Sequence, residues 1–148
     1  DDTVRMLAEQ SLWKVWMRSG DRDVDDLLRE GMRQMESGKM AQAVDAFTRV
    51  IDKRPDFAEG WNKRATAWWL IGDEERSLQD CDETLKRNPN HFGALSGCGL
   101  IYAQRDQLDE ALDFLERALA INPNMPGVER GLALVRHRLG TTKGRRST

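Results

Sequence analysis

The sequence has few of the residues that most often carry chemistry. Its 148 residues include two cysteines, two histidines and one tyrosine, and Cys81, His91 and Cys98 do not have the spacing of a zinc site. There is no glycine-rich phosphate-binding loop, and no pattern brings a nucleophile together with a base and an orienting group. We therefore expect a protein without a metal, a cofactor or an enzymatic activity.

Charge of one sign and long apolar runs are also scarce. Lys and Arg number 23 against 25 Asp and Glu, a net charge of −2, which does not favour a protein that coats nucleic acid. Basic residues gather between 126 and 148, but no aromatic residue lies among them, as a nucleic-acid surface would need. No apolar run approaches the roughly 18 residues of a membrane-spanning helix, so we expect no membrane insertion.

What the sequence does contain is a repeat with a step of 34 residues. Three sets of residues keep this step: Pro55, Pro89 and Pro123; Gly31, Ala65 and Gly99; Phe47, Cys81 and Leu115. Small residues in phase at such a step are typical of an array of helical repeats.

The clearest unit of the array runs from Ala58 to Pro89. Apolar residues recur at helical spacing on both sides of Gly72 and Asp73. Glycine favours the left-handed conformation that ends a helix, and proline cannot extend one. The unit is therefore predicted to be two amphipathic helices joined by a tight turn.

These units resemble the tetratricopeptide repeat family. The second unit carries the family's spacing in Trp61, Ala65, Trp68, Ser77, Cys81 and Pro89, and the third in Leu95, Gly99, Tyr102, Ala111, Ala118 and Pro123. The resemblance covers about Val24 to Gly140. It implies an all-α fold, a right-handed α-solenoid of three helix-turn-helix repeats with an N-terminal helix and a C-terminal capping helix. It says little about a ligand, because function lies in a site and not in the scaffold.

The resemblance and the turn signals together divide the chain into an N-terminal helix in 1–20, repeats at 24–57, 58–91 and 92–125, a C-terminal helix in 126–140, and a disordered basic tail in 141–148. Asp21 or Asp23 is expected to cap the first repeat, Asp56 and Glu59 to form a capping box, and Asn90 to cap the third repeat. The N-terminal helix is expected to cover the first repeat or, alternatively, to dock onto another chain.

The two cysteines are predicted to be buried. Cys81 replaces an apolar core residue of the repeat, and Cys98 precedes the small Gly99. Since the second helix of one repeat packs on the first helix of the next, we expect the two Cα atoms to lie near disulfide reach, about 4.4–6.8 Å. Whether the thiols are bonded depends on the compartment.

Two hypotheses for function follow, from different classes. The first is a protein-binding adaptor whose concave groove holds a peptide or helix of a partner protein. Its groove residues are predicted to be Asn62, Thr66, Trp69, Ser96, Leu100, Ala103, Arg130 and His137, with an acidic end of the partner near Arg130. The second is a structural scaffold, a homo-oligomer or subunit bridge, that associates through Trp13 and Trp16 of the N-terminal helix.

Some relatives that share this repeat bind the terminal carboxylates of heat-shock proteins with a clamp of Lys, Asn and Arg. The matching places here hold Leu28, Met32, Lys63, Gly93 and Gly97, so we expect no clamp-type binding of chaperones. The chain begins at Asp1 and not at a methionine, and we expect that its N-terminus has been processed or truncated. This start and a resemblance of the Ala58–Thr66 stretch point toward an exported bacterial or organellar protein, but they do not fix the compartment.

Overall fold

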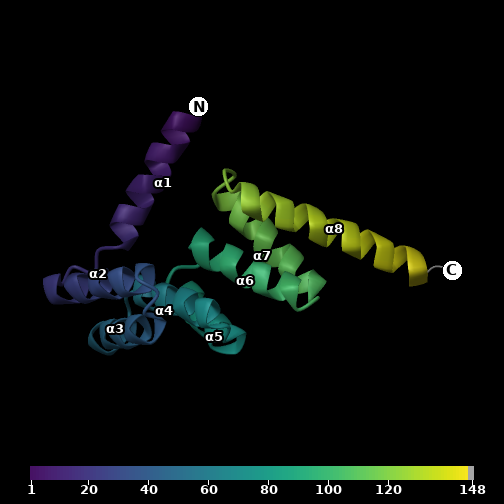
Figure 1. The fold of residues 1–148 in the computed structure, drawn as a ribbon. Coiled ribbons are helices and arrows are strands. Elements are labelled where there is room, and N and C mark those ends of the chain that lie inside the picture. The colour runs from purple at the N-terminus through teal and green to yellow at the C-terminus, as the bar shows by residue number, and fades with distance from the viewer. Residues whose placement is uncertain (147–148) are drawn as a thin grey trace. The chain divides into compact units, whose positions relative to one another are not determined.

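The computed structural model describes residues 1–146 and shows an all-α chain, with eight helices and no strand in that part (Figure 1). The helices are α1 (Asp2–Trp16), α2 (Arg22–Glu36), α3 (Met40–Lys53), α4 (Ala58–Ile71), α5 (Glu74–Arg87), α6 (Phe92–Gln104), α7 (Leu108–Ile121) and α8 (Pro126–Arg146). They fall into two compact units, Asp1–Pro89 and the chain from Asn90 onward. The predicted all-α fold of three helix-turn-helix repeats is confirmed.

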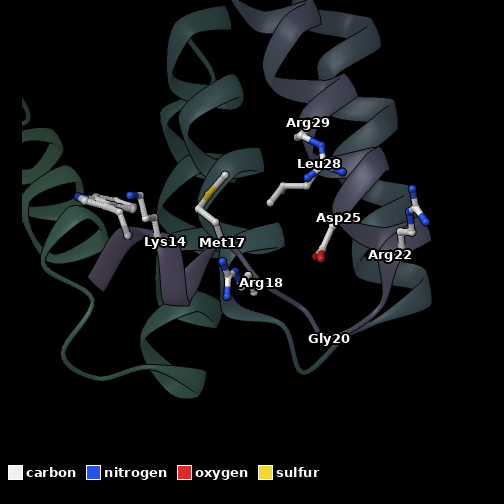
Figure 2. A pocket seen from close by; sticks show the side chains of 9 residues that line it. Lys14, Met17, Arg18, Gly20, Arg22, Asp25, Leu28 and Arg29 are labelled. Atoms are coloured by element: carbon white, nitrogen blue, oxygen red, sulfur yellow. The ribbon is translucent and has the colours of Figure 1, made fainter. Parts of the chain in front are cut away.

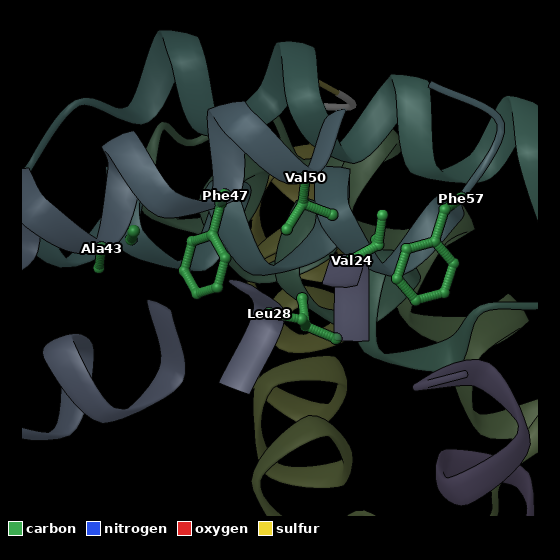
Figure 3. Close-up of a cluster of buried hydrophobic side chains, with 7 residues drawn as sticks. Val24, Leu28, Ala43, Phe47, Val50 and Phe57 are labelled. Carbon is green, nitrogen blue, oxygen red and sulfur yellow. The ribbon is translucent and has the colours of Figure 1, made fainter. Parts of the chain in front are cut away.

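The core of the first unit lies where α2, α3 and α4 meet (Figure 3). Its buried side chains come from apolar stripes at helical spacing: Val24, Leu28, Ala43, Phe47, Val50, Phe57 and Ala67. Phe57, in the linker between α3 and α4, is only 8% exposed and packs into this cluster. The linker is therefore held by the core and fixes how the second helix pair follows the first.

The tight turns inside the three repeats share one backbone geometry. The turn residue one or two positions after each first helix has a positive φ: 75° at Gly38, 94° at Gly72 and 58° at Asp106. The next amide N–H donates to a carbonyl five residues earlier, as in Asp73 N to Trp68 O at 2.9 Å. Asp106 takes this conformation without being glycine, which asparagine and aspartate tolerate better than other side chains.

The small residues at the 34-residue step lie where the two helices of a repeat cross. A Cβ built on Gly31 would lie 2.4 Å from Phe47 Cε1, and one on Gly99 would lie 2.6 Å from Leu115 Cδ2. Real Cβ contacts are never this short, so only glycine fits against these large partners. The repeat step is thus a packing requirement and not only a sequence pattern.

The helix caps differ in part from those expected. Asp21 caps α2, accepting from Asp23 N at 2.9 Å. Asp56 does not form a capping box, because α4 begins only at Ala58 and its N-cap Phe57 makes no side-chain cap bond. The carboxylate of Asp56 instead accepts hydrogen bonds from Arg54, and these bonds lower its pKa.

Two further expectations are corrected at the third repeat and the C-terminus. His91, and not Asn90, caps α6, with its Nδ1 accepting from Ala94 N at 3.1 Å. Helix α8 continues through Gly140 and Gly144 to Arg146, against the expectation of a disordered tail from 141, because each glycine inside a helix costs only about 1 kcal/mol. Residues 147–148 of that expected tail lie outside the described residues.

Helix α1 does not cover the first repeat as a cap would. None of its residues is buried. Contact with the rest of the unit is made near its C-terminal end, where Met17 packs against the core cluster and Lys63 Nζ lies 5.7 Å from the centre of the Trp13 ring. Trp13 and Trp16 pack edge-to-face with ring centres 5.6 Å apart.

Candidate protein-interaction surfaces

Trp69 is the most prominent exposed aromatic of the predicted groove. Helix α4 places it one residue after Trp68, about 100° further round the helix. Trp68 is half-buried with the Arg76 guanidinium 4.7 Å from its ring centre, whereas Trp69 is 44% exposed. Thr66 is exposed one turn earlier, and its hydroxyl donates to Asn62 O at 3.1 Å. The end of α4 therefore presents a large aromatic side chain that is not needed in the core.

Two other predicted groove residues are buried, and their side chains form hydrogen bonds within the protein. Asn62 is 7% exposed and donates from Nδ2 to Glu59 Oε1 at 3.0 Å. Ser96 is 8% exposed, and its hydroxyl donates to Gly93 O at 3.0 Å. Their polar atoms support the surrounding backbone and side chains, and little of either residue is left for a partner to contact.

The remaining predicted residues belong to the second unit. Leu100 packs beside Gly131 of α8, where an added Cβ would lie 3.0 Å from Leu100 Cδ2, and Ala103 is half-buried. Arg130 and His137 are exposed on α8, and Leu134 between them is 53% exposed. These three residues follow one another at four and three positions, so they share one face of α8.

Sequence reasoning missed a pocket at the elbow between α1 and α2 (Figure 2). It has a volume of about 720 Å³ and is lined by Trp13, Lys14, Met17, Arg18, Gly20, Arg22, Asp25, Leu28 and Arg29. The sequence gives no signal for it, since the pocket depends on the angle at which α1 leaves α2. We call it the elbow pocket.

The elbow pocket combines an apolar wall with a basic rim. Asp25, its one acidic residue, accepts from the hydroxyl of Ser19 at 2.6 Å and from its amide at 2.9 Å. Lys14, Arg18 and Arg22 make no ion pair with any described residue. These three positive charges therefore remain available to an acidic ligand.

A second basic group, around α4 and α5, is satisfied internally. Arg64 forms a bidentate pair with Asp80, at 2.8 and 2.9 Å. The guanidinium carbon of Arg64 lies 5.3 Å from the centre of the Trp61 ring, and that of Arg87 lies 4.5 Å from it. Since each of these charges has an acidic or aromatic partner within the repeat, this face is better explained by stability than by recognition.

No arrangement for catalysis or metal binding is found among the described residues. They contain no group of three or more metal-ligating side chains, and none of their helices is long and apolar enough to cross a bilayer. Cys81 and Cys98 are each 3% exposed, which agrees with the predicted burial. They belong to different units, so the predicted distance between them stays a prediction.

Known proteins share both the sequence pattern and the fold. Two family models described as tetratricopeptide repeat match residues 28–90 and 93–125. A "TPR repeat-containing protein" of Rhizobium etli is 33% identical over 108 residues, which are 73% of this chain and 53% of that protein. The chain spans about half or less of the length of the curated relatives it matches first.

Solved structures agree with the family models. The first TPR domain of Spaghetti (RPAP3), bound to the HSP90 peptide SRMEEVD, has a TM-score of 0.76 at 24% identity, covering 79% of this chain and 93% of that one. The TPR2B domain of yeast Sti1, in a complex with an Hsp70 peptide, has a TM-score of 0.73 at 18% identity, covering 80% and 99%. The chain has three helix pairs with the same turn geometry, and both family models match them. It therefore belongs to the tetratricopeptide repeat family.

Proposed function

We propose that this chain is a non-catalytic protein-interaction module that binds a segment of a partner protein through Trp69 on α4. The single observation that carries the proposal is the 44% exposure of Trp69 beside the half-buried Trp68. Tryptophan is among the residues most enriched in binding hot spots. Proteins of this fold, among them the HSP90-peptide complex, bind peptides, which supports the class of function.

The elbow pocket adds a chemical preference to this proposal. Leu28 in its wall stands 34 residues before Asn62, which lies one helical turn before Thr66. We propose that the pocket and Trp69 bind the same partner segment. Lys14, Arg18 and Arg22 favour carboxylates, while the Trp13 and Met17 side chains favour an apolar residue. We expect a partner segment that alternates acidic and large apolar residues. In the second unit, the exposed Arg130 offers positive charge to an acidic segment.

The role of Trp69 is tested by measuring the affinity of an identified partner for the parent protein and for Trp69→Ala. Loss of a hot-spot tryptophan should cost at least about 2 kcal/mol, a thirty-fold rise in Kd, with the fold unchanged by circular dichroism. The matched control is Leu70→Ala, which removes a neighbouring side chain of similar exposure, 48%, from a different side of α4. Equal affinities for parent and Trp69→Ala would refute the proposal.

The role of the elbow pocket is tested with Arg18→Ala and Arg22→Ala. Each variant should weaken binding and reduce its dependence on salt, because each removes a charge that attracts the partner. Arg49→Ala on α3, also an exposed arginine, is the control and should leave the affinity unchanged. A partner affinity that does not depend on ionic strength would contradict an acidic segment.

The proposal excludes binding through a carboxylate clamp. Leu28 and Met32 are apolar and partly or fully buried, and Lys63 is engaged by Glu59 at 3.7 Å and by the Trp13 ring. The peptide SRMEEVD is therefore expected to bind equally well, or equally poorly, whether its C-terminus is a free carboxylate or an amide. A tenfold loss on amidation, about 1.4 kcal/mol, would show that a clamp exists.

A further inference from the structure

Helix α1 has an apolar stripe that the rest of the first unit leaves uncovered. In Figure 1, α1 projects away from α2 and α3, and none of its residues is buried. Its contacts with the unit run along the face that carries Trp13 and Met17. Because an α-helix turns about 100° per residue, the uncovered stripe lies on the other side of the helix from Trp13 and Met17.

The stripe is made of uncharged residues at helical spacing: Val4, Leu7, Ala8, Ser11, Leu12 and Val15. The four large side chains are exposed, by 63% at Val4, 55% at Leu7, 42% at Leu12 and 67% at Val15. The Ser11 hydroxyl donates to Leu7 O at 2.8 Å, so the stripe can be covered without leaving that donor unpaired. A contiguous exposed apolar surface of this kind marks an interaction site.

The chemistry of the stripe is the same in both directions. From either end it runs valine, leucine, small residue, small residue, leucine, valine, with the same spacing. A two-fold interface requires one patch that is complementary to itself, and reversal of the helix direction brings each residue of this stripe opposite its counterpart. The small Ala8 and Ser11 at the middle let two helix backbones approach closely.

We propose that α1 forms a homodimer by pairing antiparallel with α1 of a second copy. Val4 packs against Val15 of the partner subunit, Leu7 against the partner's Leu12, and Ala8 against the partner's Ser11. The interface uses the side of the helix opposite Trp13, and Trp16, one turn after Leu12, lies at its border. The sequence suggested Trp13 and Trp16 for self-association. It does not depend on partner binding through Trp69.

The oligomeric state is tested by sedimentation velocity on the whole chain over a dilution series in the micromolar range. The parent should show a monomer–dimer equilibrium, and Leu7→Asp should raise the dimer Kd at least about thirty-fold. The matched control is Met6→Asp, since Met6 is 49% exposed, adjacent in sequence and off the stripe. A monomeric parent, or equal weakening by both variants, would overturn the proposal. Trp69→Ala should not change the dimer, and Leu7→Asp should not change the binding of a partner.

The antiparallel register is tested by oxidative cross-linking with Ala8→Cys and Ser11→Cys. An equal mixture of the two single variants should give a heterodimeric disulfide, because position 8 of one copy faces position 11 of the other within disulfide reach. Each single variant alone should cross-link poorly, and the parent measures the background from its two buried cysteines. Efficient cross-linking of the single variants alone would show a parallel pair and overturn this register.

Discussion

The helix crossing in the third repeat gives a prediction that can be worked from the structure. Gly99 of α6 faces Leu115 of α7, and Leu115 is fully buried. A Cβ at residue 99 would lie 2.6 Å from Cδ2, 2.7 Å from Cγ and 3.2 Å from the backbone nitrogen of Leu115. Because one of the obstructing atoms belongs to the main chain, a side-chain rotation alone cannot make room, and the helices must separate.

The magnitude follows from two opposing effects of the substitution Gly99→Leu. Overpacking in a well-filled core costs typically about 1–3 kcal/mol, and four added carbon atoms at a main-chain contact place this case at the upper end. The higher helix propensity of leucine compared with glycine offsets about 1 kcal/mol of this cost. We expect a net loss of at least about 2 kcal/mol, or about 4–8 °C in melting temperature for a chain of this size.

Thermal melts followed by circular dichroism test this expectation. The matched control is Gly140→Leu in α8, where a Cβ would meet nothing within 4 Å and the variant should melt at the parent temperature or above. A second control combines Gly99→Ala with Leu115→Cys, which recreates the small pair that the second repeat has at Ala65 and Cys81. Equal melting temperatures for Gly99→Leu and Gly140→Leu would refute the close crossing.

Three smaller changes test single features of the fold by the same melts. Asp106→Gly should stabilise the protein by about 0.5–1 kcal/mol, because glycine adopts the positive φ without strain. His91→Ala should cost more than the about 1 kcal/mol of the lost cap on Ala94 N, because truncating this fully buried side chain also leaves a cavity, while His91→Asn should keep the cap. Hydrogen bonds from Arg87 and Lys86 lower the pKa of Glu83 below its ordinary value of 4.5. The stabilisation from these bonds is complete above pH 4.5 and is lost as the pH falls through the pKa of Glu83 in the folded protein. Glu83→Gln should therefore reduce the difference in melting temperature between a pH above 4.5 and a pH below that folded pKa.

The sequence alone determined the features of this protein that depend on local geometry. The 34-residue step, the small residues at the helix crossings and the turn glycines each reflect a requirement of the backbone within one repeat. For that reason the three helix pairs were predicted correctly, and the positive φ of Asp106 falls at the position that the repeat assigns to Gly38 and Gly72. The exposure of Trp69 was also predictable, since Trp68 keeps the phase of the core stripe.

The tertiary structure alone decided which side chains remain open to a partner. Asn62 was predicted for the groove but is buried with Glu59, and His91 replaces Asn90 as a cap because of how the chain enters α6. The elbow pocket and the uncovered stripe of α1 exist only because of the angle between α1 and α2. The Asn62–Glu59 pair and the His91 cap each join residues three positions apart, and the elbow pocket is lined by residues 13–29. These features depend on side-chain burial and on the path of the backbone between helices, and the period of a helix carries no information about either.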